Sequence, residues 1–133
     1  MARKQRSLHG LGKLQAEVME IIWDKAEATV SDVHQVISRR RPVTYTTVLV
    51  AMQKLDKKGW LTHRREGRAN VYTPRRSREQ ANAGLLRELV AVAFQSDPKL
   101  LLSHLLDQHP LSQAELTELR QLIEARRREK SRE

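Results

Sequence analysis

TYTTVLVAMQKLDKKGWLTHRREGRANVYTP, residues 44–74, is the stretch that decides the fold of this 133-residue chain. Its first half carries apolar residues at helical spacing, namely Val48, Met52 and Leu55. Thr44 can cap the start of this helix and Gly59 can end it. Its second half contains two short β-prone segments around a Gly-containing turn. Such a pattern predicts a β-hairpin with a basic tip, directly after a helix.

Two more helices are expected before this stretch. The first covers roughly residues 12–24, and the second starts at a cap provided by Thr29 or Ser31 and ends before Pro42, because the residue before a proline avoids the helical region. Three helices followed by a hairpin predict a winged helix-turn-helix over residues 11–75.

After this domain the sequence becomes rich in leucine. Three helices are expected, with caps at Ser77 (with Gln80), Asp97 (before Pro98) and Ser112 (with Glu115). Helices with so many leucines need a partner surface, so residues 76–126 are predicted to be a three-helix homodimerisation region, followed by a charged tail at 127–133. The fold class is therefore mainly α. The expected dimer residues are Leu86, Leu89, Val90, Phe94, Leu101, Leu105, Leu116, Leu119 and Ile123.

The distribution of charge separates the two halves of the chain. The formal net charge is +9, and residues 1–75 hold 15 basic against 7 acidic residues, whereas residues 76–133 hold 10 against 9. The basic first half indicates a polyanionic partner such as DNA, RNA or an anionic membrane surface. Residues 1–10 are basic and precede the first apolar helix, which favours a flexible arm.

The same sequence argues against several classes of protein. There is no cysteine, which excludes disulfides and thiolate metal sites and fits a cytoplasmic protein. No run of about 18 apolar residues occurs, so no membrane insertion is expected. No HExxH, GxSxG or P-loop motif is present, and the histidines do not cluster as ligands. The chain is therefore expected to be no enzyme, and to need no cofactor or metal.

The second helix of a helix-turn-helix offers its first residues to base edges in the major groove, and a neighbouring basic hairpin can follow the phosphates. Short hydroxyls at 44–47 suit phosphates and base edges, and threonine methyls suit thymine. The expected DNA-contacting residues are Ser31, Thr44, Tyr45, Thr46, Thr47, Val50, Lys54, Arg64, Arg65 and Arg68. An alternative remains open for several of these residues. Thr44 and Thr46 could only cap the helix, Tyr45 could pack against the first helix, and the arginines could belong to a solvated turn.

The sequence resembles the penicillinase-repressor family, of the BlaI/MecI type, over residues 11 to about 123. The matching segments are LGKLQ (11–15) with Val18, Met19 and Trp23, TVSDV (29–33), YTTV (45–48), Leu55, KG (58–59), GRA (67–69) and YTP (72–74), with a weaker similarity through residues 77–79, Phe94 and residues 116–122.

This resemblance implies a dimeric bacterial repressor that binds inverted repeats in the promoters of antibiotic-resistance or stress operons. In antibiotic-responsive members a membrane sensor-protease triggers cleavage of an Asn-Phe pair in the C-terminal part. The nearest equivalent here is His104-Leu105, which departs from that pair. Copper-responsive relatives use C-terminal cysteines, which this chain lacks.

Three other functions compete with a sequence-specific repressor. A non-specific architectural protein would bind DNA through charge alone and would not need the hydroxyl-rich helix start. An RNA-binding module is disfavoured, because aromatic residues make up 4% of the chain and no stacking platform is evident. A protein–protein adaptor would use the leucine-rich half instead.

Overall fold

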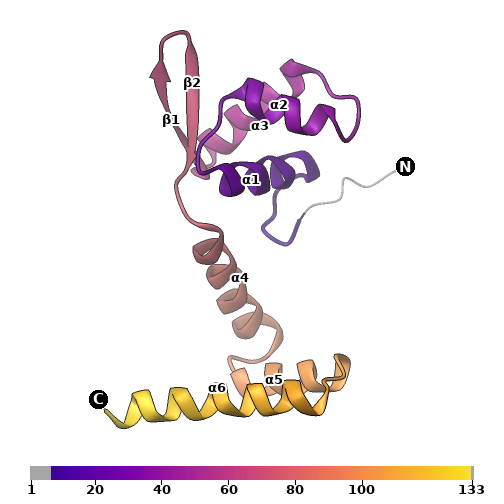
Figure 1. The fold of residues 1–133 in the computed structure, drawn as a ribbon, viewed down its shortest axis with the longest axis vertical. Helices are drawn as coiled ribbons and strands as arrows, with labels where there is room; N and C mark the ends of the chain where they lie inside the picture. Colours follow the sequence, from indigo (N-terminus) through magenta and orange to yellow (C-terminus); the bar gives the residue numbers. More distant parts are fainter. Residues whose placement is uncertain (1–6, 133) are drawn as a thin grey trace. The chain divides into compact units, whose positions relative to one another are not determined.

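The computed structural model describes residues 7–132, and the chain divides into two compact units with the boundary after Arg87. The described residues form six helices and one two-stranded antiparallel sheet (Figure 1). In chain order the elements are α1 (Lys13–Lys25), α2 (Val30–Ser38), α3 (Tyr45–Lys57), β1 (Leu61–Glu66), β2 (Ala69–Pro74), α4 (Arg78–Ala93), α5 (Pro98–Gln108) and α6 (Gln113–Ser131). This is the mainly helical architecture, with a winged helix-turn-helix at its N-terminal side, that the sequence predicts.

The core of the first unit lies where α1, α2 and α3 meet. Each helix contributes one apolar stripe at helical spacing, and these side chains are fully buried: Val18, Met19 and Ile22 from α1, Val33 and Ile37 from α2, and Val48, Met52 and Leu55 from α3. Leu61 at the start of β1 joins them. Because one face of α3 is fixed in this core, its opposite face is left for solvent.

α3 begins and ends where the sequence predicts. The Thr44 side chain accepts a hydrogen bond from the backbone N–H of Thr47, which is the N-cap arrangement. At the other end Gly59 has φ +83°, its N–H donates to the Asp56 carbonyl, and the Trp60 N–H donates to the Leu55 carbonyl. These two bonds form a Schellman motif, which needs a left-handed residue and therefore favours glycine.

β1 and β2 form the hairpin, or wing, which extends beyond the three helices (Figure 1). Pairing runs from Leu61 opposite Pro74 to Glu66 opposite Ala69, so Gly67 and Arg68 make a two-residue turn. Gly67 has φ +60°, the sign that such tight turns require at their first central residue.

α2 begins at a complete capping box. Of the two caps left open by the sequence, Thr29 is the one used: its hydroxyl accepts from the Asp32 N–H, and the Asp32 carboxylate accepts from the Thr29 N–H. The backbone hydrogen bond from Thr29 also lowers the pKa of Asp32 below its usual value. Ser31 lies one residue into the helix and is exposed.

In the C-terminal part, all three expected caps are present. Ser77 and Gln80 bond reciprocally at α4, Asp97 caps α5 with Pro98 at its first position, and Ser112 and Glu115 form a capping box at α6. The backbone N–H of Ser112 also lowers the pKa of Glu115. Within the described residues no side chain of α5 or α6 is fully buried.

α6 is longer than the sequence predicts. It continues through Ser131, into the segment expected to be a charged tail from residue 127. The reason is that this segment consists of strong helix formers, and the side chains of Arg127 and Arg126 pair with Glu124 and Glu129 at i,i+3 spacing.

Residues 1–6 of the expected basic arm lie outside the described residues, and so does Glu133. Within the rest of the arm, the N–H of Gly10 donates to the Ser7 carbonyl, and the His9 ring lies edge-on to Trp60 at 5.5 Å. Over residues 7–132 no helix is long and apolar enough to cross a membrane. The same residues contain no group of three or more acidic or histidine side chains placed to hold a metal ion.

Candidate nucleic-acid interface

The outer face of α3 carries four of the residues expected to contact DNA. Thr46, Thr47, Val50 and Lys54 recur at helical spacing and are all exposed, opposite the buried stripe of the same helix. They border an open hollow of about 550 Å³ between α3 and the start of α1. Its lining residues are Gly12, Lys13, Leu14, Gln15, Thr46, Thr47, Val50, Ala51 and Lys54. Lys13 was not singled out from the sequence, because only the packing of α1 on α3 brings it beside the exposed face of α3.

The hydroxyls at the start of α3 have different roles. Thr44 Oγ1 accepts from the Thr47 N–H at 3.2 Å and lies 2.8 Å from Thr47 Oγ1, so both hydroxyls are engaged in the cap. The hydroxyl of Thr46 has no hydrogen-bond partner within residues 7–132. The structure therefore uses Thr44 as a cap and leaves Thr46 as the available hydroxyl.

Tyr45 does not pack in the core against α1, as one reading of the sequence suggests. Its side chain is 49% exposed, and its ring lies edge-on to His34 of α2, with the centroids 5.9 Å apart. His34 itself is hydrogen-bonded through Nε2 to the Val43 carbonyl at 2.9 Å. Tyr45, at the first position of α3, therefore contacts α2 with one edge of its ring and keeps about half of its surface exposed.

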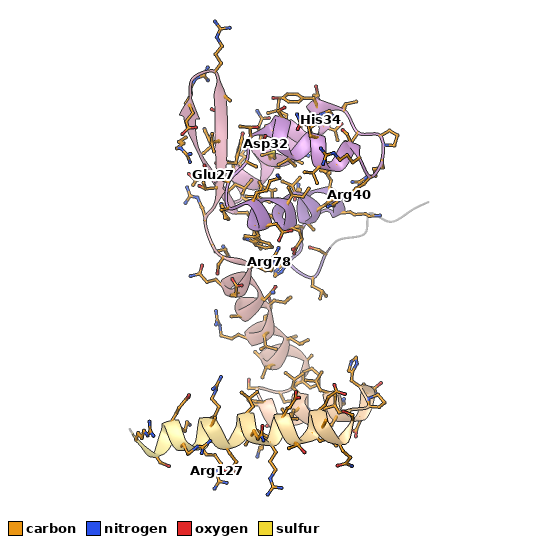
Figure 2. The ribbon with its side chains drawn as sticks, in the orientation of Figure 1. Glu27, Asp32, His34, Arg40, Arg78 and Arg127 are labelled. Carbon is orange, nitrogen blue, oxygen red and sulfur yellow. The ribbon has the colours of Figure 1, made fainter. Side chains whose placement is uncertain are left out.

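Two of the wing arginines are available and one is engaged. Arg64 pairs with Glu27 at 2.8 Å and with Glu66 at 3.1 Å, and these carboxylates neutralise its charge (Figure 2 labels Glu27). The hydrogen bond from Arg64 lowers the pKa of Glu27. Arg65 and Arg68 are exposed, and they form no ion pair with the part of the chain that the structure describes. The sequence treats Arg64 and Arg65 alike, but the fold separates them.

The wing is attached to α3 by a pair of ionisable side chains. His63 Nδ1 of β1 contacts a carboxylate oxygen of Asp56 at the end of α3, and its ring lies 5.4 Å from that of Tyr72 on β2. Tyr72 is buried, which raises the pKa of its hydroxyl. The N–H and carbonyl of Tyr72 also bond to those of Ala28, so the wing base is held to the α1–α2 loop. These contacts fix the wing beside α3.

The turn of the helix-turn-helix is held to α1 by a carboxylate that the sequence did not reveal. Arg40 and Arg41 both bond to Glu17 on α1, and the hydrogen bond from Arg41 is the main cause of the lowered pKa of Glu17 (Figure 2 labels Arg40). These ion pairs hold the turn between α2 and α3 against α1, and they thereby help to orient α3.

The residues expected at a dimer surface remain accessible in the single chain. Leu86, Leu89, Leu105, Leu116 and Ile123 are exposed, and Val90, Phe94, Leu101 and Leu119 are half-buried. The Phe94 ring lies edge-on to His104 at 5.3 Å. His104 and Leu105, the expected cleavage region, lie inside α5, so a protease could reach the bond between them only after that helix unwinds locally.

Comparison with known proteins agrees with this architecture. The model of a family described as "Penicillinase repressor" matches residues 11–125. The transcriptional regulator BlaI of Mycobacterium tuberculosis is 39% identical over 87 residues, covering 65% of this chain and 63% of BlaI, so the match spans less than two thirds of that relative. The penicillinase repressor of Bacillus licheniformis is 26% identical over 114 residues, covering 86% of this chain and 89% of the relative.

Among solved structures, the DNA-binding domain of the repressor BlaI is 28% identical and covers 56% of this chain and 90% of its own, with a TM-score of 0.49. The family model matches most of the chain and includes both the winged helix and the leucine-rich helices. The chain therefore belongs to the penicillinase repressor family.

Proposed function

We propose that this chain is a transcriptional repressor that binds an inverted-repeat operator in double-stranded DNA as a homodimer. The observation that carries the proposal is the exposed face of α3 with Thr46, Val50 and Lys54, flanked by a wing whose Arg65 and Arg68 have no acidic partner among the described residues. The names of the family and of its relatives, which are regulators and repressors rather than enzymes, support the same function.

The geometry suits the major groove. An α-helix fits this groove and presents its first residues to base edges, where Thr46 can bond to a base or phosphate and Val50 can contact a thymine methyl. Lys54, farther along the same face, suits a backbone phosphate, as does Lys13 across the hollow. Arg65 and Arg68 on the wing would follow the phosphates or enter the adjacent minor groove.

The homodimer is proposed from the apolar surface of the C-terminal helices. Leucines exposed on α4, α5 and α6 of a single chain would be covered by the same surface of a second copy, as in a two-fold symmetric interface. Two winged helices held in this way would contact half-sites about one helical turn apart, near 34 Å.

The regulated genes are proposed from the relatives' names alone. A penicillinase repressor controls antibiotic resistance, and we propose resistance or stress operons as the targets here. Release by a sensor-protease acting near His104 and Leu105 is a further part of the proposal, and it requires local unwinding of α5.

Selection of bound fragments from sheared genomic DNA, followed by footprinting, tests the proposal directly. We expect a bounded, protected inverted repeat upstream of a gene. Equilibrium sedimentation of the purified chain should show a homodimer without any added protein. Uniform protection along the DNA, or a stable monomer, would contradict the proposal.

The competing function is non-specific coating of DNA, which the net charge of +9 favours. The double variant Thr46→Ala/Thr47→Ala separates the two functions, because it removes no charge. A repressor loses its preference for the selected site over random duplex, whereas an architectural protein keeps the same affinity for both.

A further inference from the structure

The first turn of α4 is held to α1 by a single arginine that contacts two carboxylates. Arg78 bonds to Glu20 at 2.8 Å and to Asp24 at 2.7 Å (Figure 2 labels Arg78). Its side chain is 35% exposed, and its guanidinium lies 5.6 Å from the centre of the Trp23 ring. A planar guanidinium suits this combination of two carboxylates and one aromatic ring, and lysine does not.

The segment that leads from the wing into α4 is held by the two tryptophans. The Trp23 and Trp60 rings lie edge-to-face at 6.3 Å, and the Arg76 guanidinium lies 4.9 Å from the Trp60 ring. Trp23 Nε1 donates to the Arg76 carbonyl at 2.9 Å. We call Glu20, Trp23, Asp24, Trp60, Arg76 and Arg78 the α1–α4 clamp.

The start of α4 depends on these side chains because it has little apolar burial of its own. Ala81 is the one buried residue of α4. A polar contact one turn farther along joins Asn82 Oδ1 to His9 Nε2 at 3.2 Å. The clamp therefore supplies the ion pairs that hold the start of α4 against α1.

We propose that the α1–α4 clamp sets the direction in which α4 leaves the winged helix, and thereby fixes the half-site spacing that the dimer accepts. This inference rests on the proposed function, since α4 leads from the DNA-binding unit into the leucine-rich helices. The clamp residues act as positioning residues, through their contacts with one another rather than through the exposed face of α3. A rigid pair of binding modules gains from simultaneous binding only at matching spacing, whereas a loosened pair tolerates more spacings and binds each less tightly.

The test compares full-length variants on three duplexes: a single half-site, the selected operator, and an operator with its spacer lengthened by about 5 base pairs, half a helical turn. Arg78→Gln removes the clamp cation. Glu20→Gln/Asp24→Asn removes both of its carboxylate charges and shifts the net charge in the opposite direction. Arg87→Gln is the matched charge control. It removes an exposed arginine of α4 that forms no ion pair with any residue in 7–132.

The spacing preference is the ratio of the affinities for the two full operators. Both clamp variants are expected to lower this ratio on the order of tenfold, because a loosened α4 weakens the simultaneous binding of two half-sites without abolishing it. Affinity for the single half-site should fall slightly in Arg78→Gln and rise slightly in the double variant, following charge. Arg87→Gln should leave the ratio unchanged.

An unchanged ratio in either clamp variant would overturn the inference. A ratio that changes in opposite directions in the two variants, as their net charges do, would overturn it as well. Asp24→Asn alone, at a side chain that is 69% exposed, is a milder variant whose folding is not at risk, and it should lower the ratio in the same direction. If the unmodified chain shows no bounded site, the proposed function fails together with this inference, whereas a bounded site without any spacing preference overturns this inference alone. Both outcomes are recognised before any variant is made.

Discussion

Arg41 and Glu17 form a two-point ion pair between the turn after α2 and the middle of α1. Nη1 of Arg41 lies 2.9 Å from Oε1 of Glu17, and Nη2 lies 2.6 Å from Oε2. The Glu17 side chain is 15% exposed, and Arg40 donates a third hydrogen bond to it at 3.1 Å. This carboxylate is therefore the electrostatic connection between α1 and the segment that positions α3.

The Glu17 pair predicts a loss of stability in acid. Hydrogen bonds from Arg41 and Arg40 lower the pKa of Glu17 below 4.5, the ordinary value for a glutamate. Its contribution is then fully present above pH 4.5 and is lost as the pH falls through the lowered value. Glu17→Gln should cost about 1 kcal/mol at neutral pH, and this difference should shrink in acid. Urea unfolding at several pH values measures it, with Glu118→Gln as the exposed control.

The wing arginines should differ in their salt dependence. Arg68→Gln removes an unpaired cation and should reduce the slope of log K against log salt by about 1, and Lys54→Gln on α3 should do the same. Arg64→Gln should leave the slope nearly unchanged, because Glu27 and Glu66 already neutralise that side chain. Binding titrations across a salt series measure the slopes. Equal slopes for the Arg64 and Arg68 variants would remove the distinction between the two side chains.

Thr44 and Thr46 should affect different properties, Thr44 the stability of the fold and Thr46 the binding of DNA. Thr44→Ala removes the N-cap of α3 and should lower the free energy of unfolding by about 1 kcal/mol. Thr44→Ser keeps the hydroxyl and should retain most of that stability. Thr46→Ala should change stability by less than about 0.5 kcal/mol and should instead weaken binding to the selected site. Thermal unfolding and operator binding, measured on the same samples, decide whether the two roles are distinct.

An apolar residue on α4 should govern self-association. Leu89→Gln places an amide where a second copy is expected to cover a leucine, and burial of one such side chain contributes about 1.5–3 kcal/mol. The dimer dissociation constant should therefore rise roughly tenfold or more. Sedimentation over a range of concentrations measures it, and Glu88→Gln on the same helix is the control. A dimer of unchanged strength would remove Leu89 from the interface.

The elements were predictable where they depend on local chemistry. Thr44 and Gly59 delimit α3 because a cap and a left-handed turn need those residue types, and the caps at Ser77, Asp97 and Ser112 follow the same rule. The apolar stripe of α3 is buried as its spacing indicates. The position of a helix start is thus visible in a few consecutive residues.

Long-range pairs of charges were not predictable in this way. Arg41 finds Glu17 at a separation of 24 residues, and Arg78 finds Asp24 at a separation of 54. In a chain with 25 basic and 16 acidic residues, many such pairings are compatible with the sequence, and the packing of the helices selects among them. For the same reason, the difference between Arg64 and Arg65 became apparent from the fold alone.

Trp23 and Trp60 are the chain's two tryptophans, and both belong to the α1–α4 clamp. The intrinsic fluorescence of the unlabelled protein therefore reports on this one cluster, away from the exposed face of α3. Displacement of Arg76 or Arg78 from the indole rings would change the intensity and colour of the emission. Changes in the contacts between α1 and the start of α4 can therefore be followed by tryptophan fluorescence in real time, without a dye, while the protein binds DNA.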